Sequence, residues 1–152
     1  MVEVEIVAPQ STESLLDLME RFYAEERYPF DRDEARAALE PFLGDPTLGR
    51  AWLFRDGGAA VGYFVFTLGW SLEYGGRDAF VDELFVSLSH RGRGLGRRAL
   101  EVIEEACREL RSSSPPPRSR KRQLAGGGAL SAEGLRGPRS PPDDEEVHRG
   151  IN

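Results

Sequence analysis

Hydrophobic and polar positions recur with two distinct periods over the first 110 residues. Alternation with period two, as in Val2-Glu3-Val4-Glu5-Ile6, predicts strands with one buried face, and apolar positions at helical spacing predict amphipathic helices. The predicted elements are a strand at 2–6, helices at 12–23 and 33–41, a hairpin at 51–55 and 59–68, a strand at 79–86 and a helix at 95–110. The order β-α-α-β-β-β-α predicts an α/β sandwich in which helices cover a central sheet.

Composition divides the chain near residue 110. All fourteen aromatic residues lie between Phe22 and Phe85, and residues 111–152 contain none. Residues 1–110 hold 21 acidic and 12 basic side chains, whereas residues 111–152 hold 8 basic and 5 acidic ones. A segment rich in Pro, Gly, Ser and Arg buries too little apolar surface to offset its ordering entropy. We therefore expect a folded domain over 1–110 and a disordered tail over 111–152.

Length, charge and cysteine content exclude several classes of protein. No apolar run reaches the roughly 20 residues of a membrane helix, and no basic segment precedes an apolar one at Met1. The single Cys107 excludes an internal disulfide, fits a reducing compartment and has no neighbouring base that would make it a nucleophile. A net charge of −6 over 152 residues disfavours nucleic-acid binding. We expect a cytoplasmic protein with neither a membrane nor a nucleic acid as partner.

A glycine-rich junction between the last predicted strand and helix carries the main chemical signal. Leu84-Phe85-Val86 ends the strand, and Arg91-Gly92-Arg93-Gly94-Leu95-Gly96 opens the helix. Glycines let the backbone approach a ligand closely, and a helix start presents N–H groups with partial positive charge. Together with the arginines they predict a site for a pyrophosphate. The segment lacks the Gly-Lys-Ser/Thr of a P-loop and the glycine spacing of a dinucleotide fold.

This junction resembles the Arg/Gln-x-x-Gly-x-Gly/Ala signature of the GNAT N-acetyltransferases, with Arg91, Gly94 and Gly96 at its fixed positions. The preceding residues 82–86 resemble the fourth strand of that family, and the element order up to Leu110 follows the family order. The resemblance implies a three-layer α/β sandwich around a central mixed sheet. It also implies transfer of an acetyl group from acetyl-CoA to a primary amine of a small molecule.

The resemblance assigns roles to individual residues. Backbone groups of the fourth strand pair with the pantetheine arm, and amides of the loop hold the pyrophosphate. The implied cofactor-binding residues are Leu84, Phe85, Val86, Arg91, Gly92, Arg93, Gly94, Leu95, Gly96 and Arg97. Two acids of the strand, Asp82 and Glu83, are the catalytic candidates, with Asp82 as acceptor of the amine proton and Glu83 on the opposite face. The alternative is that both are solvated carboxylates at a sheet edge.

Other residues carry weaker signals. Trp70, Glu73 and Tyr74 are candidates to line an amine-binding mouth, or they serve packing. His90 is either a phosphate contact or a solvated loop residue. The acidic run Asp143–Glu146 lacks the ligand spacing of a cation site and is interpreted as a solvated charge run, so no metal is expected.

The sequence departs from the family after the third helix, where the family has a fifth strand, a fourth helix and two closing strands. The tail can be back-translated with freely chosen third bases and then read one base later. In that shifted frame, residues 118–131 can read EVENGNWRAVALYR, which resembles the missing half of the family domain. We therefore hypothesise a single-base change of reading frame near Arg111. Two functions remain open: an N-acetyltransferase, or a catalytically impaired remnant or interaction module with an incomplete cofactor site. An unpaired sheet edge would also permit a homodimer.

Overall fold

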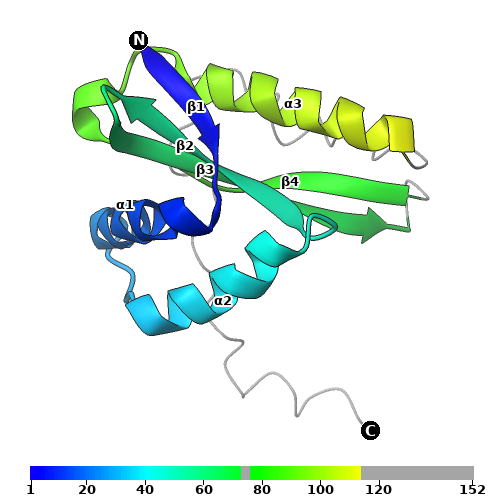
Figure 1. Ribbon diagram of the computed structural model, residues 1–152, viewed down its shortest axis with the longest axis horizontal. Helices are drawn as coiled ribbons and strands as arrows, with labels where there is room; N and C mark the ends of the chain where they lie inside the picture. The colour runs from blue at the N-terminus through cyan, green and yellow to red at the C-terminus, as the bar shows by residue number, and fades with distance from the viewer. Residues whose placement is uncertain (73–75, 114–152) are drawn as a thin grey trace, which may run out of the picture.

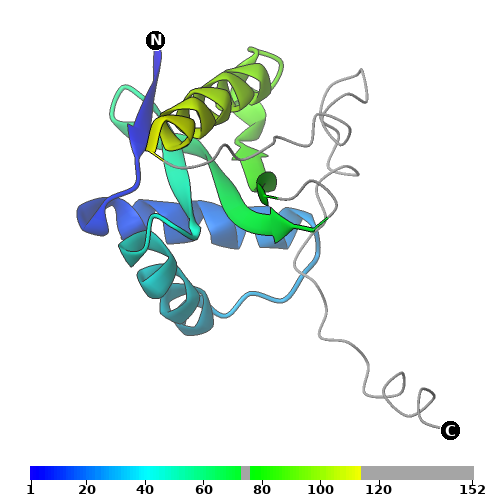
Figure 2. The same ribbon diagram turned by 90° about the vertical axis from the view of Figure 1, so that its right-hand side faces the viewer.

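The computed structural model describes residues 1–72 and 76–113. Its elements are β1 (Val2–Ile6), α1 (Thr12–Glu25), α2 (Arg32–Gly44), β2 (Gly49–Asp56), β3 (Ala59–Ser71), β4 (Gly76–Val86) and α3 (Leu95–Ser113), with short 3-10 turns at Pro9–Ser11 and Leu88–His90. The four strands form one sheet in the order β1-β2-β3-β4. Helices α1 and α2 cover one face of this sheet and α3 covers the other (Figures 1 and 2). The predicted three-layer α/β sandwich and its element order are confirmed.

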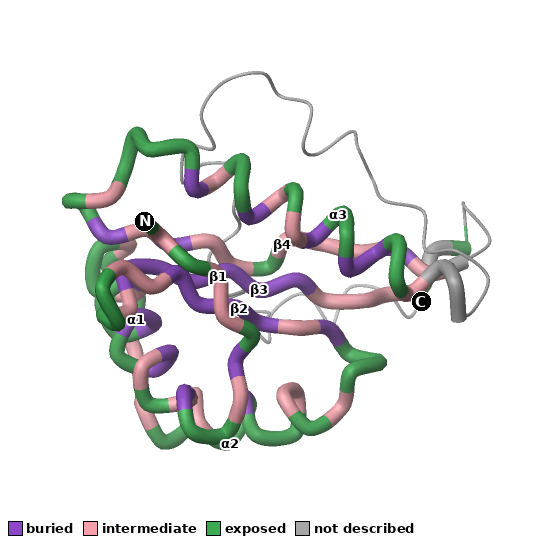
Figure 3. The backbone as a smooth tube through the Cα atoms, turned by 45° about the horizontal axis from the view of Figure 1, so that its top comes forward, coloured by how far each residue is buried: buried purple, intermediate pink, exposed green. Residues whose placement is uncertain are grey.

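Each face of the sheet carries its own hydrophobic core, because alternate side chains of the central strands point to opposite faces. Trp52 points toward α3 and stacks on Phe64, with ring centroids 5.0 Å apart. Its neighbour Leu53 joins Tyr63 in the core beneath α1 and α2, and both side chains are fully buried. Burial is therefore concentrated in the middle strands and on the inward helix surfaces (Figure 3). This explains why β3 and the middle of β2, residues 51–54, are apolar almost throughout.

The hairpin of β2 and β3 forms as the sequence predicts. Gly57 and Gly58 occupy its two central turn positions with φ values of 57° and 84°, the geometry of the two-residue turn that matches strand twist. Helix α2, in contrast, continues through Pro41, where the sequence predicted its end, to Gly44. Phe42 and Leu43 pack against the core beneath α1. Their burial favours one more helical turn despite the N–H that proline lacks.

All strand pairings among the described residues are antiparallel. The mixed sheet that the resemblance implies therefore depends on residues beyond 113. Helix α3 continues to Ser113, so residues 111–113, which were predicted to begin a disordered tail, are helical. The rest of that tail, the expected lack of closing strands and the frame change fall outside the described residues, and they stay predictions. Within residues 1–72 and 76–113, no helix combines the length and apolar character needed to cross a membrane.

Candidate active site

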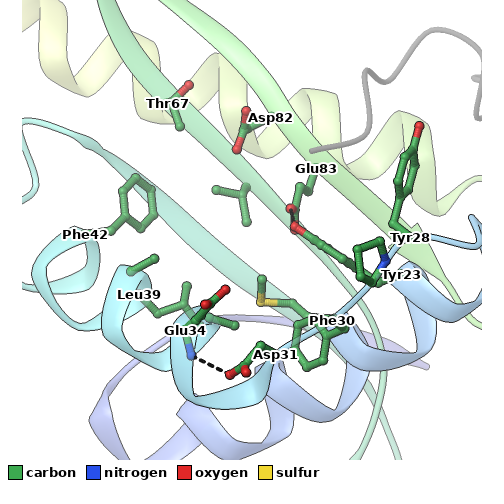
Figure 4. A pocket seen from close by; sticks show the side chains of 15 residues that line it. Tyr23, Tyr28, Phe30, Asp31, Glu34, Leu39, Phe42, Thr67, Asp82 and Glu83 are labelled. Atoms are coloured by element: carbon green, nitrogen blue, oxygen red, sulfur yellow. Dashed lines mark hydrogen bonds between the residues drawn. The ribbon is translucent and has the colours of Figure 1, made fainter. Parts of the chain in front are cut away.

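A cavity of about 530 Å³ opens between the helices α1 and α2 and the strands β3 and β4. Its lining combines apolar, aromatic and acidic side chains and contains no basic residue (Figure 4). The lining residues are Met19, Tyr23, Tyr28, Pro29, Phe30, Asp31, Glu34, Ala35, Ala38, Leu39, Phe42, Val65, Thr67, Asp82 and Glu83. A volume of this size suits a small organic molecule.

A bulge in β4 brings both predicted carboxylates to this cavity. Val65 of β3 pairs with Glu83, but the next residue of β3, Phe66, pairs with Val81, so Asp82 is an extra residue without a counterpart. The extra residue shifts the alternation of side chains, and Asp82 and Glu83 both line the cavity (Figure 4). The expectation that Glu83 lies on the opposite face from Asp82 is therefore wrong. Strict period-two alternation does not hold across a bulge.

Two tyrosines hold the carboxylate of Glu83. The Tyr23 hydroxyl donates to Oε1 at 2.9 Å, and the Tyr63 hydroxyl donates to Oε2 at 2.8 Å. Burial raises the pKa of Glu83 above its ordinary value, while both tyrosine hydrogen bonds oppose that rise. Burial and the charge of Glu83 raise the pKa of both tyrosines, so they stay protonated and act as donors. The sequence did not indicate either tyrosine, because each occupies an apolar position of a helix or strand.

Asp82 differs from Glu83 in its surroundings. Asp82 is exposed at the cavity wall, whereas Glu83 is only partly exposed. A carboxylate with a raised pKa is a better proton acceptor near neutral pH than an ordinary one, because its conjugate acid is closer in strength to the group it serves. An exposed carboxylate at the same cavity attracts a cation. The pair thus offers one acid–base group and one cation-binding group side by side.

The glycine loop at the end of β4 has the geometry of an anion site. Gly92 and Gly94 have φ values of 73° and 78°, in the region that favours glycine, and no atom lies within 4 Å of the place a Cβ would take. The N–H of Arg98 makes the first hydrogen bond of α3, to the Gly94 carbonyl at 3.0 Å. Amides before that position have no partner within the helix. The predicted residues from Gly92 to Arg97 are thus brought together around open space.

Arg91, which the resemblance assigns to cofactor binding, is held by groups of the protein itself. Its Nε donates to the carbonyl oxygen of Val86 at 2.7 Å, and its terminal nitrogen pairs with Glu25 of α1 at 2.5 Å. Its guanidinium also lies over the Phe85 ring, 5.8 Å from the centroid. The side chain therefore ties the loop to the end of β4 and to α1. Arg97, which was expected to add charge at the loop, pairs with Glu101.

The remaining candidates take up other roles or lie elsewhere. Trp70, at the end of β3, is 65% exposed and does not line the cavity. Glu73 and Tyr74 lie outside the described residues, as does the run 143–146. His90 bonds Asp56 of the β2–β3 hairpin at 2.9 Å and so anchors the glycine loop. The described part of the chain holds no group of three or more residues fit to bind a metal.

Comparison with known proteins gives a consistent result. The model of the acetyltransferase (GNAT) family matches residues 13–114. An integron cassette protein from the mobile metagenome of Cole Harbour Salt Marsh is similar in structure, with 34% sequence identity, a TM-score of 0.73 and a match over 91% of each chain. No curated protein matches the sequence significantly.

Two solved acetyltransferases share the fold at lower identity. Ribosomal-protein-alanine N-acetyltransferase from Brucella melitensis biovar Abortus 2308 has 19% identity and a TM-score of 0.62, over 88% of this chain and 85% of its own. AAC(6')-Iy, solved with the bisubstrate analogue CoA-S-monomethyl-acetylneamine, has 15% identity and a TM-score of 0.63, over 78% of each chain. At such identities the likeness concerns the fold alone.

Proposed function

Because this chain belongs to the GNAT acetyltransferase family, we propose that it transfers an acetyl group from acetyl-CoA to a primary amine of a small molecule. One observation carries this proposal. The strand that presents the half-buried Glu83 to the cavity also leads, at its carboxyl end, into the open glycine loop. A cavity for an acceptor and an anion site for a cofactor therefore adjoin the same strand.

The residues of the loop and of β4 fit the cofactor. Amides from Gly92 to Arg97 supply N–H donors to a pyrophosphate, and the open space beside Gly92 and Gly94 admits it. Among the described residues, β4 is the last strand of the sheet, so its outer edge at 84–86 is open to an extended arm, apart from the Val86 carbonyl that Arg91 occupies. When bound, acetyl-CoA supplies a thioester whose carbon–sulfur bond breaks as the carbon–nitrogen bond forms, giving CoA thiol and the amide.

We assign the acid–base work to Glu83. An amine enters as an ammonium ion and must lose a proton before its nitrogen can attack a carbonyl carbon. The carboxylate of Glu83, held by Tyr23 and Tyr63, accepts that proton directly or through one water molecule. Its raised pKa suits this task, because burial weakens it as an acid. We assign Asp82 to binding the incoming ammonium at the cavity wall.

Acetylation assays on the full chain test this proposal. Purified protein is incubated with acetyl-CoA and a panel of primary amines, and both the released thiol and the mass of the product are measured. We expect turnover with at least one amine and a loss of 10²-fold or more in kcat for Glu83→Gln. Acetylation by Glu83→Gln at the wild-type rate would refute the assignment of the base. A folded wild-type chain that acetylates none of the amines would refute the function.

A further inference from the structure

The glycine loop is fastened to the β2–β3 hairpin by a hydrogen bond between His90 and Asp56. We propose that Asp56 is a positioning residue for this loop. Through His90 it holds the loop in the geometry that binds a pyrophosphate, and it does so more tightly when His90 is protonated. This inference rests on the cofactor half of the proposed function.

The contact joins two segments that are distant in the chain. Asp56 ends β2 at the hairpin turn, and His90 ends the 3-10 turn that precedes the glycine loop. Nε2 of His90 lies 2.9 Å from Oδ2 of Asp56, and the two side chains are only 15% and 34% exposed. The backbone supports the same contact, because the N–H of Ser87 donates to the Val61 carbonyl at 2.8 Å. The start of the loop is thereby fixed to the hairpin.

The ring of His90 has partners in both of its charge states. A carboxylate only accepts, so Nε2 carries a hydrogen and donates it to Asp56. Nδ1 lies 2.8 Å from the Ser89 hydroxyl, which donates to a neutral ring and accepts from a protonated one. Protonation therefore adds charge to the bond with Asp56 without breaking a contact. Because a hydrogen bond between two charged groups is stronger than one with a neutral donor, the loop is held more tightly at lower pH.

Two further positive groups lie near the Asp56 carboxylate. The amino group of Met1, an exposed residue, lies 3.9 Å from Oδ1, and Arg93 of the loop acts on the carboxylate through its charge. The hydrogen bond from His90 has the largest effect and holds the pKa of Asp56 below its ordinary value. The carboxylate is therefore ionised in the range, about pH 5 to 8, where an imidazole titrates. His90→Gln leaves Met1 and Arg93 in place, so this variant isolates the imidazole.

Anchoring matters for affinity because the loop is rich in glycine. Gly92 and Gly94 have positive φ values, and a glycine segment that is not fastened populates many conformations. The apparent affinity for a ligand falls in proportion to the fraction of molecules in the binding geometry. A contact that fixes the start of the loop raises that fraction.

A second anchor, on the other side of the loop, provides the matched comparison. Arg91 pairs with Glu25 of α1 at 2.5 Å. The arginine stays charged throughout the range in which an imidazole titrates, so this pair keeps its strength there. Loss of Glu25 should therefore weaken cofactor binding by the same factor at each pH. Loss of Asp56 should weaken it by a factor that grows as pH falls.

Calorimetric titration of acetyl-CoA into the full chain at about pH 6 and about pH 8 tests the proposal. Asp56→Asn keeps an oxygen for the Nε2–H but removes the charge, and His90→Gln keeps a donor that is neutral at every pH. Each affinity is divided by that of the wild type at the same pH, because the phosphates of the ligand titrate as well. We expect both variants to bind more weakly, by a factor about threefold larger at the lower pH. Glu25→Gln should show one factor at both.

Three results would overturn the proposal. Removal of a negative charge beside an anion site strengthens binding by itself, so binding by Asp56→Asn as tight as the wild type's would show that Asp56 does not position the loop. A pH-dependent loss in His90→Gln but not in Asp56→Asn would mean that protonated His90 acts on the ligand directly. An equal loss at both pH values in both variants would show that protonation of His90 has no effect.

Amide hydrogen exchange in the ligand-free chain separates this inference from the proposed function. The N–H groups of His90 and Arg91 donate to carbonyls of Ser87 and Leu88, so their exchange, followed by NMR, reports on the anchor. Faster exchange in Asp56→Asn than in the wild type, by a larger factor at the lower pH, supports the inference even if acetyl-CoA does not bind and the proposed function fails. Unchanged exchange in Asp56→Asn overturns the inference, and acetyl-CoA binding by the wild type then leaves the function standing.

Discussion

Removing the hydroxyl of Tyr63 tests whether Glu83 is held as a buried anion. Tyr63→Phe keeps the ring, which is fully buried and lies 6.3 Å from the Phe22 ring and 6.1 Å from the Phe85 ring between centroids. The change deletes one donor, 2.8 Å from Oε2 of Glu83. A hydrogen bond to a charged group contributes about 1.5–3 kcal/mol, and burial prevents water from replacing it. We expect a loss of that size in the free energy of unfolding at neutral pH.

The loss of stability in Tyr63→Phe should depend on pH, and the pKa of Glu83 decides whether it grows or shrinks as pH rises. Burial raises that pKa above the ordinary value of 4.5, so the folded state binds the proton more tightly than the unfolded state does. The contribution of Glu83 to stability is therefore complete below the ordinary value and declines as pH rises through the raised pKa. Tyr63→Phe removes a bond that stabilises the anion, so this decline becomes larger. The variant should be more destabilised at about pH 8 than at about pH 4.

Urea unfolding followed by far-ultraviolet circular dichroism measures the free energy of unfolding of wild type and variant at each pH. Tyr23→Phe is the control, because Tyr23 makes the equivalent bond to Oε1 but is only partly buried. Water can replace its hydroxyl in part, and the loss should be smaller. A destabilisation by Tyr63→Phe that is the same at both pH values would refute the idea that Glu83 is ionised in the folded protein.

Three further variants, one of them with a matched control, test other parts of the account. Asp82→Asn should raise KM for the amine several-fold with little change in kcat, whereas a large loss of kcat in steady-state assays would make Asp82 the base. Gly62→Ala should destabilise the fold by about 1–3 kcal/mol in thermal unfolding, because its Cβ would lie 2.6 Å from a carbonyl oxygen of β4. Gly44→Ala, with no atom within 4 Å, should cost nothing, and an equal cost at both sites would contradict this packing argument. Arg91→Met should weaken acetyl-CoA binding in calorimetry by freeing the loop from Val86, and unchanged binding would exclude that role.

Features set by neighbouring residues could be predicted from the sequence. The glycine loop lies within one run of residues, and the hairpin turn needs only Gly57 and Gly58, so both follow from local conformational preferences. The end of α2 could not be placed in this way. The packing of Phe42 and Leu43 against other elements decided it.

The centre of the candidate site depends on contacts between distant residues. Tyr23 and Tyr63 are 60 and 20 residues from Glu83 in the chain, and nothing local to either indicates a hydrogen bond to a carboxylate. The bulge at Asp82 has no glycine to reveal it, so period-two alternation assigned Glu83 to the wrong face. The position of Arg91 follows from Glu25 on α1, which only the packed structure brings close.

The central claim is that the glycine loop binds the pyrophosphate of acetyl-CoA, and calorimetric titration of acetyl-CoA into the full chain tests it most directly. The same titration is made with the variants Gly94→Asp and Gly94→Asn. Both substitutions fill the same open position at a φ of 78°, but only aspartate adds negative charge where a pyrophosphate is expected. We predict binding by the wild type, a modest loss in Gly94→Asn and a loss at least about tenfold larger in Gly94→Asp. A folded wild type that does not bind acetyl-CoA, or binding that Gly94→Asp leaves intact, would contradict the account.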